Sequence, residues 1–259
     1  MISFKSLHQG KEPLLLGNVW NAQSARAFEK SGYKALATSS SAVALSLGYE
    51  DGEQMTFEEY FYMIKRIKES VSIPLSVDLE AGYGPADDII VSNILKLLDI
   101  GVAGINLEDT YVVEGKRELM DREAFYEKLE KIFLGLKERR GDIFINIRTD
   151  PFLLGIDNAL EETLRRAELF EKLNADGIFV SGMTVDNDIK TVVNATSLPV
   201  NVMGLPDLPD FDTLTALGVK RITSGGFLNR HIYNELEIIS TEIINNRSFS
   251  TLFCTHETY

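Results

Sequence analysis

Short apolar runs alternate with longer amphipathic segments along the whole chain. The runs are rich in β-branched and aliphatic residues, which favours buried strands, and the segments between them place apolar residues three or four positions apart, which favours helices. The stripe of Phe57, Tyr60, Phe61, Ile64 and Ile67 is typical of the second kind and indicates a core-facing helix. The pattern predicts eight strands, within 14–20, 33–37, 73–80, 102–109, 143–150, 177–181, 198–203 and 219–224, each followed by a helix. Long loops are predicted after the second strand, through Gly52, and after the fourth, from Thr110 to about Met120.

Glycine marks several predicted helix-to-strand turns. Gly32, Gly101 and Gly218 each stand between a helical stripe and an apolar run, and Asn174 takes the equivalent place before the sixth strand. Glycine and asparagine end helices in the left-handed conformation, so these positions predict short αβ loops. Strands alternating with helices predict a parallel sheet, and at 259 residues the closed (β/α)8 TIM barrel is favoured, as one domain over 1–259. An open doubly wound sheet is the alternative, although no G-x-G-x-x-G follows the first strand.

Composition narrows the function classes. The chain is 44% hydrophobic and 25% charged, which is ordinary for a globular protein, and its formal net charge of −13 argues against nucleic acid or an anionic membrane as a partner. The single cysteine, Cys254, excludes a disulfide framework within one chain, and no run of eighteen apolar residues occurs. These features predict a soluble cytoplasmic protein.

Two acids stand at the end of the third predicted strand. Asp78 and Glu80 are two positions apart, so in a continuous strand their side chains share a face. Adjacent carboxylates repel each other, and a hard divalent cation such as Mg²⁺ relieves that repulsion. Helix capping or pairing with basic residues is the alternative interpretation.

Other predicted strands also end in polar residues. Active sites of (β/α)8 barrels lie at the carboxyl ends of the strands, so these residues are candidates for one site. The serines follow the second strand, and the remaining candidates lie on the fourth, fifth and seventh: Ser39, Ser40, Ser41, Asn106, Glu108, Asn146, Arg148, Asp150 and Asn201. Each has a structural alternative, namely a Glu108–Arg148 ion pair, an Asn106–Asn146 hydrogen bond and a helix cap at the serines.

Together these residues predict enolate chemistry. Asp78, Glu80 and Glu108 offer oxygen ligands to Mg²⁺, partly through water, and Arg148 offers a bidentate clamp to a substrate carboxylate. Backbone N–H groups near Ser39–Ser41 can bind a second carboxylate or a developing oxyanion. The chain contains only three histidines, His8, His231 and His256, none at a strand end, which argues against a Ser-His-Asp triad. Another possibility is phosphate binding at Ser224-Gly225-Gly226 in a different barrel class.

Several motifs resemble the isocitrate lyase/phosphoenolpyruvate mutase superfamily, along nearly the whole chain. They are Asn18-Val19-Trp20-Asn21-Ala22 with Ser24-Ala25-Arg26, Ala37-Thr38-Ser39-Ser40 with Leu47-Gly48-Tyr49-Glu50-Asp51-Gly52, Val77-Asp78-Leu79-Glu80-Ala81-Gly82-Tyr83-Gly84, Gly104-Ile105-Asn106-Leu107-Glu108-Asp109 and Arg148-Thr149-Asp150. The resemblance implies a Mg²⁺-dependent barrel that cleaves or rearranges a C–C or P–C bond through a pyruvate enolate. It also implies a homodimer or homotetramer in which the last helix is swapped between subunits.

The resemblance assigns roles by motif. It implies that Asp78 binds Mg²⁺ most directly and that Asp51, Glu80 and Glu108 reach the ion through water. It places Ser39, Ser40 and Ser41 at the substrate carboxylate and Arg148 against the substrate, with the pocket also lined by Asn201 and Arg230.

The lid after the fourth strand departs from the lyase pattern. Lyases of this superfamily carry a catalytic cysteine in a Lys-Lys-Cys-Gly-His-type lid, whereas residues 109–117 here contain no cysteine or histidine. Candidates for proton handling in the lid are Lys116, Glu114 and Tyr111, and Ser181 stands where several relatives have glutamate or histidine. We therefore expect a lyase, hydrolase or phosphonomutase for a small oxo- or hydroxy-carboxylate, or else a non-catalytic carboxylate- or metal-binding barrel.

Overall fold

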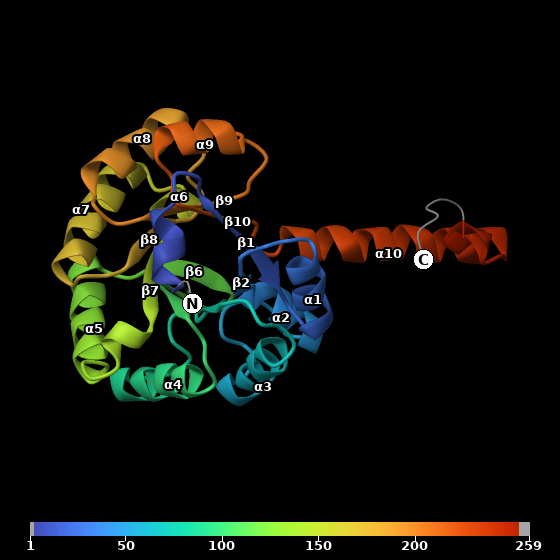
Figure 1. The fold of residues 1–259 in the computed structure, drawn as a ribbon, viewed down its shortest axis with the longest axis horizontal. Coiled ribbons are helices and arrows are strands. Elements are labelled where there is room, and N and C mark those ends of the chain that lie inside the picture. The colour runs from blue at the N-terminus through green and yellow to red at the C-terminus, as the bar shows by residue number, and fades with distance from the viewer. Residues whose placement is uncertain (1–2, 254–259) are drawn as a thin grey trace.

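The computed structural model describes residues 3–253, and its central element is a closed barrel of eight parallel strands. Around the ring (Figure 1) the strands follow one another as β1 (Leu14–Val19), β2 (Ala35–Thr38), β3 (Leu75–Asp78), β4 (Gly104–Glu108), β7 (Phe144–Thr149), β8 (Gly177–Val180), β9 (Val200–Met203) and β10 (Arg221–Thr223). The closed barrel confirms the predicted fold and rules out the open sheet. Cys254 and His256 lie outside the described residues.

Helices surround the barrel on its outside, except for the last, α10, which extends away from it (Figure 1). They are α1 (Ala22–Lys30), α2 (Ser40–Leu47), α3 (Phe57–Lys68), α4 (Asp87–Asp99), α5 (Arg122–Gly135), α6 (Pro151–Leu154), α7 (Ala159–Lys172), α8 (Asp186–Ala195), α9 (Phe211–Leu217) and α10 (Phe227–Asn246). Asn21 and Thr56 cap α1 and α3 through capping boxes, and Gly32, Gly101 and Gly218 all have positive φ, as predicted for the αβ turns. None of the described helices is long and apolar enough to cross a membrane.

Two predicted loops contain regular structure. The segment after β2 forms α2, and Ser39 accepts a hydrogen bond from the backbone N–H of Ala42 as its N-cap. The segment after β4 forms an antiparallel hairpin of β5 (Thr110–Val113) and β6 (Lys116–Leu119), which we call the lid hairpin. Both loop predictions were therefore wrong. The apolar periodicity of α2 is weak because several small residues share its buried face, and the hairpin strands are only four residues long.

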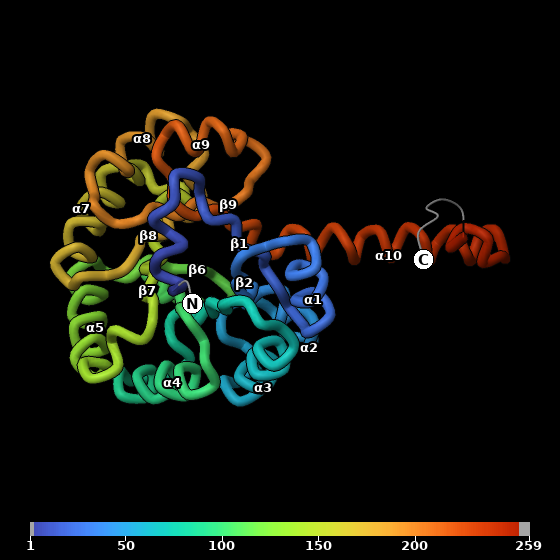
Figure 2. The backbone as a smooth tube through the Cα atoms, in the orientation of Figure 1, coloured from blue at the N-terminus to red at the C-terminus, as the bar shows by residue number. Residues whose placement is uncertain are grey.

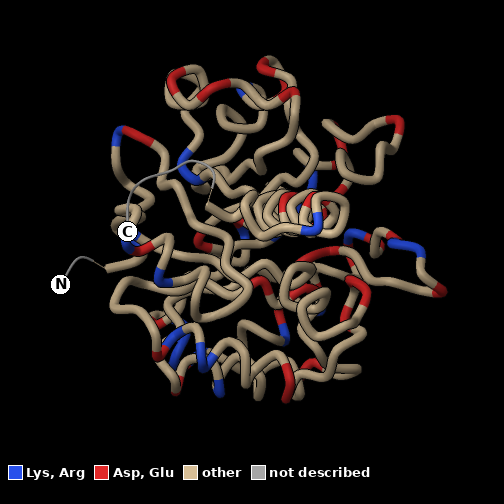
Figure 3. Tube along the Cα trace, turned by 90° about the vertical axis from the view of Figure 1, so that its right-hand side faces the viewer, with Lys and Arg blue, Asp and Glu red and all other residues tan. Residues whose placement is uncertain are grey.

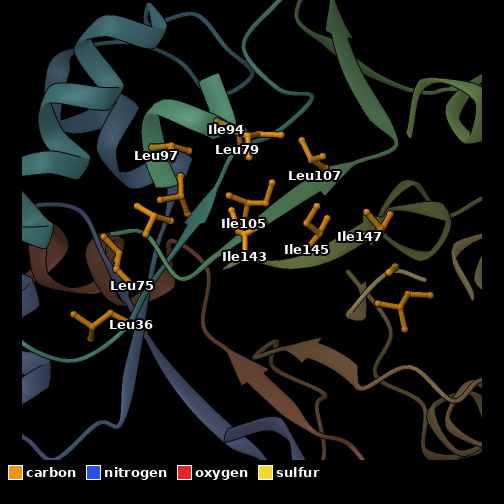
Figure 4. Close-up of a cluster of buried hydrophobic side chains, with 14 of the residues drawn as sticks. Leu36, Leu75, Leu79, Ile94, Leu97, Ile105, Leu107, Ile143, Ile145 and Ile147 are labelled. Atoms are coloured by element: carbon orange, nitrogen blue, oxygen red, sulfur yellow. The ribbon is translucent and has the colours of Figure 1, made fainter. Parts of the chain in front are cut away.

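The main core lies between the barrel strands and the helices. Outward-facing strand residues such as Ile105 and Ile145 pack with helix residues such as Ile94 and Leu97 (Figure 4). A second, smaller cluster fills the amino-terminal end of the barrel, where Phe4 contacts Phe144 at 5.6 Å between ring centroids. The N-terminal segment crosses this end of the ring (Figure 2) and includes the 3-10 helix Lys5–Gln9. Apolar side chains thus close this end, and the polar residues gather at the other.

Candidate active site

Asp78 lies at the last position of β3, at the carboxyl end of the barrel. It pairs in register with Asn106 on β4, which in turn pairs with Asn146 on β7. Its two carboxylate oxygens accept hydrogen bonds from Ser40 Oγ at 2.9 Å and from Asn106 Nδ2 at 3.1 Å. Because even-numbered residues of these strands face the barrel axis, the predicted polar set does point inward at one end of the barrel.

Glu108 is a buried acid at the last position of β4. Its Oε1 accepts hydrogen bonds from Thr110 Oγ1 at 2.9 Å and from Arg117 of the lid hairpin, and its Oε2 lies 3.0 Å from Arg148 Nη1. Burial raises the pKa of Glu108 to about 7, against the lowering effect of the Arg148 charge. Oε2 accepts no hydrogen bond, so one buried oxygen of this carboxylate keeps a free lone pair.

Arg148 is held rigidly between two acids. Its Nε and Nη2 donate to Asp150 at 2.8 and 2.9 Å, while Nη1 faces Glu108. The guanidinium carbon lies 5.6 Å from the centroid of the Phe179 ring on β8. A bidentate carboxylate on one edge and a ring beside it fix the guanidinium plane, which pre-organises it for a planar anion.

Glu80 does not continue the strand. β3 ends at Asp78, and Glu80 has a φ of 49°, so the strand alternation that predicted a shared face no longer applies there. Its carboxylate accepts hydrogen bonds from Tyr83 OH at 2.6 Å and from the backbone N–H of Glu53 at 3.1 Å. Burial, together with the charges of Glu108 and Asp51, raises the pKa of Glu80 well above its usual range. Glu80 belongs to the same acid cluster but points toward the loop after α2.

The three serines lie at the start of α2, beside Asp78. Ser39 caps the helix, Ser40 bonds to Asp78, and Ser41 is half-buried. The first N–H groups of a helix are free to bind an anion, so the expected carboxylate position is compatible with this geometry.

Other predicted residues lie farther from this center. Asn201 is fully buried and bonds to Asn146 at 3.2 Å within the barrel, and Arg230 is exposed on α10, stacked on Phe227 at 4.4 Å. In the lid hairpin, Lys116 and Glu114 are exposed. The structure brings together Asp78, Glu80, Glu108, Asp51 and Arg148, but it does not bring Arg230, Lys116 or Glu114 to them.

The three structural alternatives considered for the other strand-end residues are also present, whereas Asp78 and Glu80 cap no helix and form no ion pair within residues 3–253. Glu108 and Arg148 form an ion pair, Asn146 Nδ2 donates to Asn106 Oδ1 at 3.0 Å, and Ser39 caps a helix. In residues 3–253, no three His, Cys, Asp or Glu side chains converge closely enough to hold a metal ion between them. Direct coordination at this site would therefore come from one or two carboxylates.

Sequence reasoning missed Arg117 and the role of Asp109. Arg117 reaches Glu108 and, at 3.0 Å, Asp51 Oδ2. Asp109 is fully buried, where it accepts hydrogen bonds from the backbone N–H of Asp150 at 3.0 Å and from Arg166 at 3.1 Å. If residues 110–119 are interpreted as a hairpin, the alternation of side chains along Lys116–Arg117–Glu118 predicts that Arg117 faces inward.

The fold and the site together define a (β/α)8 barrel with an acid cluster facing a fixed arginine. Residues 4–244 match the family described as phosphoenolpyruvate phosphomutase, and the chain belongs to this family within the phosphoenolpyruvate mutase/isocitrate lyase superfamily. Homologues in this superfamily are named as enzymes, which include mutases, lyases and decarboxylases.

Three relatives show how far the likeness extends. An uncharacterized protein of Mycobacterium tuberculosis, Rv1998c, is 30% identical over 86% of this chain and 82% of its own. An oxaloacetate decarboxylase of Bradyrhizobium sp. strain BTAi1 is 27% identical over 85% of this chain and 77% of its own. The crystal structure of a Burkholderia cenocepacia J2315 protein provisionally named a phosphonomutase has a TM-score of 0.85 and 34% identity, covering 92% of this chain and 97% of that one.

Proposed function

We propose that the protein is a Mg²⁺-dependent lyase or phosphonomutase-type enzyme. It would cleave or rearrange a C–C or P–C bond of a small oxo- or hydroxy-carboxylate through a pyruvate enolate. The observation that carries this proposal is Arg148, which is fixed by Asp150 and Phe179 beside the buried acid Glu108 at the carboxyl end of the barrel. Family membership supports the reaction class.

The acids fit a hard divalent cation. Mg²⁺ takes one or two carboxylates and keeps several waters, and Asp78 with Oε2 of Glu108, which accepts no hydrogen bond, offers such a set. Asp51 and Glu80 would act through water. When bound, the ion stabilises negative charge on an enolate oxygen.

The residues of the chain supply binding and orientation. Arg148 binds the substrate carboxylate in two parallel hydrogen bonds, with its guanidinium plane already set before the substrate arrives. The N–H groups at the start of α2 bind a second anionic oxygen of the substrate. Lys116 and Glu114 of the lid stay candidates for proton handling, and reaching the substrate would require the hairpin to move.

Oxaloacetate chemistry is a second candidate. Oxaloacetate decarboxylases are among the relatives, and residues 109–117 lack the cysteine that the lyases carry in their lid. Decarboxylation of oxaloacetate passes through the pyruvate enolate, and hydrolysis to oxalate and acetate would expel an acetate enolate after water adds to the keto carbon. The same acids and arginine would serve either reaction, because both develop negative charge on oxygen. A non-catalytic carboxylate-binding barrel would keep Arg148 but turn over none of these acids.

The partners we propose are a small carboxylate and further copies of the chain. α10 extends away from the barrel (Figures 1 and 2), and of its residues only Asn229 is buried. It exposes a set of large apolar side chains: Phe227, Leu228, Ile232, Tyr233, Leu236, Ile238 and Ile244. Such a face needs cover, and swapping α10 with a neighbouring subunit in a homodimer or homotetramer would provide it. Viewed along α10 (Figure 3), acidic and basic positions are interspersed, without a basic stripe that would suit nucleic acid.

A substrate screen tests the proposal. Phosphonopyruvate, oxaloacetate and 2-methylisocitrate-like acids are incubated with Mg²⁺ or with a chelator, and pyruvate release and loss of substrate are followed. We expect at least one acid to be turned over when Mg²⁺ is present and none when the chelator removes it.

Arg148→Lys keeps the positive charge but loses the bidentate geometry, so kcat/KM should fall on the order of 100-fold. Arg139→Lys, at an exposed ion pair with Asp99, is the matched control. An unaffected Arg148→Lys enzyme would refute the role of Arg148.

A further inference from the structure

The lid hairpin directs one basic side chain into the acid cluster. β5 and β6 pair in antiparallel register from Thr110 with Leu119 to Val113 with Lys116. At the base of the hairpin, the backbone N–H of Met120 donates a hydrogen bond to the carbonyl oxygen of Asp109 at 2.8 Å. Side chains alternate along β6, so Lys116 and Glu118 are exposed while Arg117 is turned inward. The side chain of Arg117 is only 17% exposed.

Arg117 joins three separate segments. Nη1 donates to Glu108 on β4 and to Thr110 Oγ1, the latter at 2.9 Å, and Nη2 donates to Asp51 Oδ2 at 3.0 Å on the loop after α2. Glu108 thus has guanidinium groups on both sides, Arg117 at Oε1 and Arg148 at Oε2. These contacts hold the hairpin down over the acids.

Arg117 contacts two of the carboxylates that the proposed function places around the metal, Glu108 as a ligand and Asp51 through water. Glu108 is 2% exposed, and a carboxylate buried to that extent needs a nearby positive charge. A divalent cation bound at these acids repels a guanidinium that contacts the same carboxylates. Arg148 keeps its bidentate contact with Asp150, whereas both carboxylates that Arg117 bonds to, Glu108 and Asp51, belong to the proposed cation site.

We propose that Arg117 is the internal counter-ion of the acid cluster and that a divalent cation displaces it. Occupancy of the cation site and the position of the lid hairpin are then coupled: the hairpin is held down when Arg117 neutralises the acids and is released when the metal does so. This inference rests on the proposed metal site. It deepens the proposed function by naming the residue that links the metal to access through the lid.

Thermodynamic linkage makes the coupling between metal binding and the Arg117 contacts measurable. If Arg117 weakens metal binding by some factor, the metal must weaken the Arg117 contacts by the same factor. Calorimetric titration with Mg²⁺ is compared for the wild-type protein, Arg117→Gln and the matched control Lys116→Gln, which removes one charge from the exposed neighbour. We expect Arg117→Gln to bind Mg²⁺ about tenfold more tightly, within the usual range of coupling, and the control to match the wild type.

Amide hydrogen exchange of residues 110–119 gives the reciprocal readout. In the wild type, Mg²⁺ should speed exchange of the hairpin, whereas in Arg117→Gln exchange should be fast with or without Mg²⁺. Circular dichroism and thermal unfolding check that each variant folds. If wild type and Arg117→Gln bind Mg²⁺ equally well, or the variant binds more weakly, the counter-ion role is refuted while the metal site stands. If no folded variant binds Mg²⁺, the metal assignment in the proposed function fails together with the inference.

Discussion

At the scale of single residues, the site depends on charges that are buried in pairs. Arg148, Glu108 and Asp150 compensate one another, and Asn106 links Asp78 to Arg221 inside the barrel through a 3.2 Å hydrogen bond. Burial lowers the pKa of Arg221 to about 9, although the Asp78 charge acts in the opposite direction. Removing one member of a buried ion pair leaves the other charge uncompensated. The loss of unfolding free energy then exceeds the net stabilisation that the intact pair provides.

His8 shows the same dependence on burial away from the site. It stacks on Phe144 at 4.1 Å between ring centroids, and burial lowers its pKa to about 3, with the Arg221 charge acting in the same direction. The unfolded chain takes up this proton below about pH 6.5, but the folded protein does not until about pH 3. His8 should therefore cost stability progressively as the pH falls through this range and leave stability unchanged above it.

We expect His8→Gln to remove this acid sensitivity. Between pH 7 and pH 5 the wild type should lose about 2 kcal/mol of unfolding free energy relative to the variant, because each pH unit below 6.5 costs about 1.4 kcal/mol. Denaturant unfolding at the two pH values measures the difference. Gln9→Ala, at an exposed position of the same 3-10 helix, is the control and should follow the wild type. Parallel pH profiles for wild type and His8→Gln would contradict the explanation.

At the scale of elements, α7 fixes the base of the lid hairpin. Arg166 on α7 is 2% exposed, and its guanidinium donates to Asp109 Oδ2 at 3.1 Å and to the carbonyl of Met120 at 2.7 Å. These two residues are the two ends of the hairpin. Since Asp109 also accepts the backbone N–H of Asp150, Arg166 connects the hinge of the hairpin to the carboxylate that orients Arg148.

Arg166→Met should loosen the hairpin and destabilise the protein. We expect a loss of about 3–5 kcal/mol in unfolding free energy, because Asp109 keeps its buried position without its cation. Amide exchange in residues 109–120 should also become faster than in the barrel strands. The control is Arg165→Met, which changes the adjacent, exposed arginine of α7 and should alter neither the unfolding free energy nor the amide exchange of the hairpin. If exchange rises uniformly over the chain, Arg166 supports the core and not the hinge in particular.

The sequence predicted elements well where periodicity is strong and poorly where it is not. The barrel strands, the capped helices α1 and α3 and the glycine turns follow from local patterns that burial enforces. The inward set from Asp78 to Asp150 followed from strand alternation alone. Glu80 departed from it because β3 ends two residues earlier, and Arg117 was missed because its position depends on the pairing of two short strands. Two paired strands of four residues each are too short to show a clear alternation in the sequence.

At the scale of the whole molecule, α10 is the part that the single chain leaves incomplete. A helix of this length spans about 30 Å, and residues 3–253 leave several of its large apolar side chains exposed, up to 74% for Ile244. Hydrophobic cover from another subunit is what normally stabilises such an element. The oligomer is therefore expected to form through α10.

Charged substitutions on α10 test this expectation. Ile232→Glu with Leu236→Glu places two acids one turn apart on the exposed face, which should dissociate the oligomer because each carboxylate would have to be buried unpaired. Analytical ultracentrifugation gives the mass. Ile89→Glu, an equally exposed apolar site on α4, should leave the oligomer intact. A wild-type monomer, or a double variant that keeps its oligomeric mass, would rule out assembly through α10.

The central claim is that acids from β3 and β4 share one divalent ion facing Arg148. Its most direct test is a crystal structure with Mn²⁺ in place of Mg²⁺ and with oxalate, a planar dianion shaped like a pyruvate enolate. We predict an anomalous peak bonded to Asp78 and near Glu108, with oxalate between the ion and Arg148. A fully loaded crystal with no anomalous peak at Asp78, or with oxalate bound away from Arg148, would contradict the account.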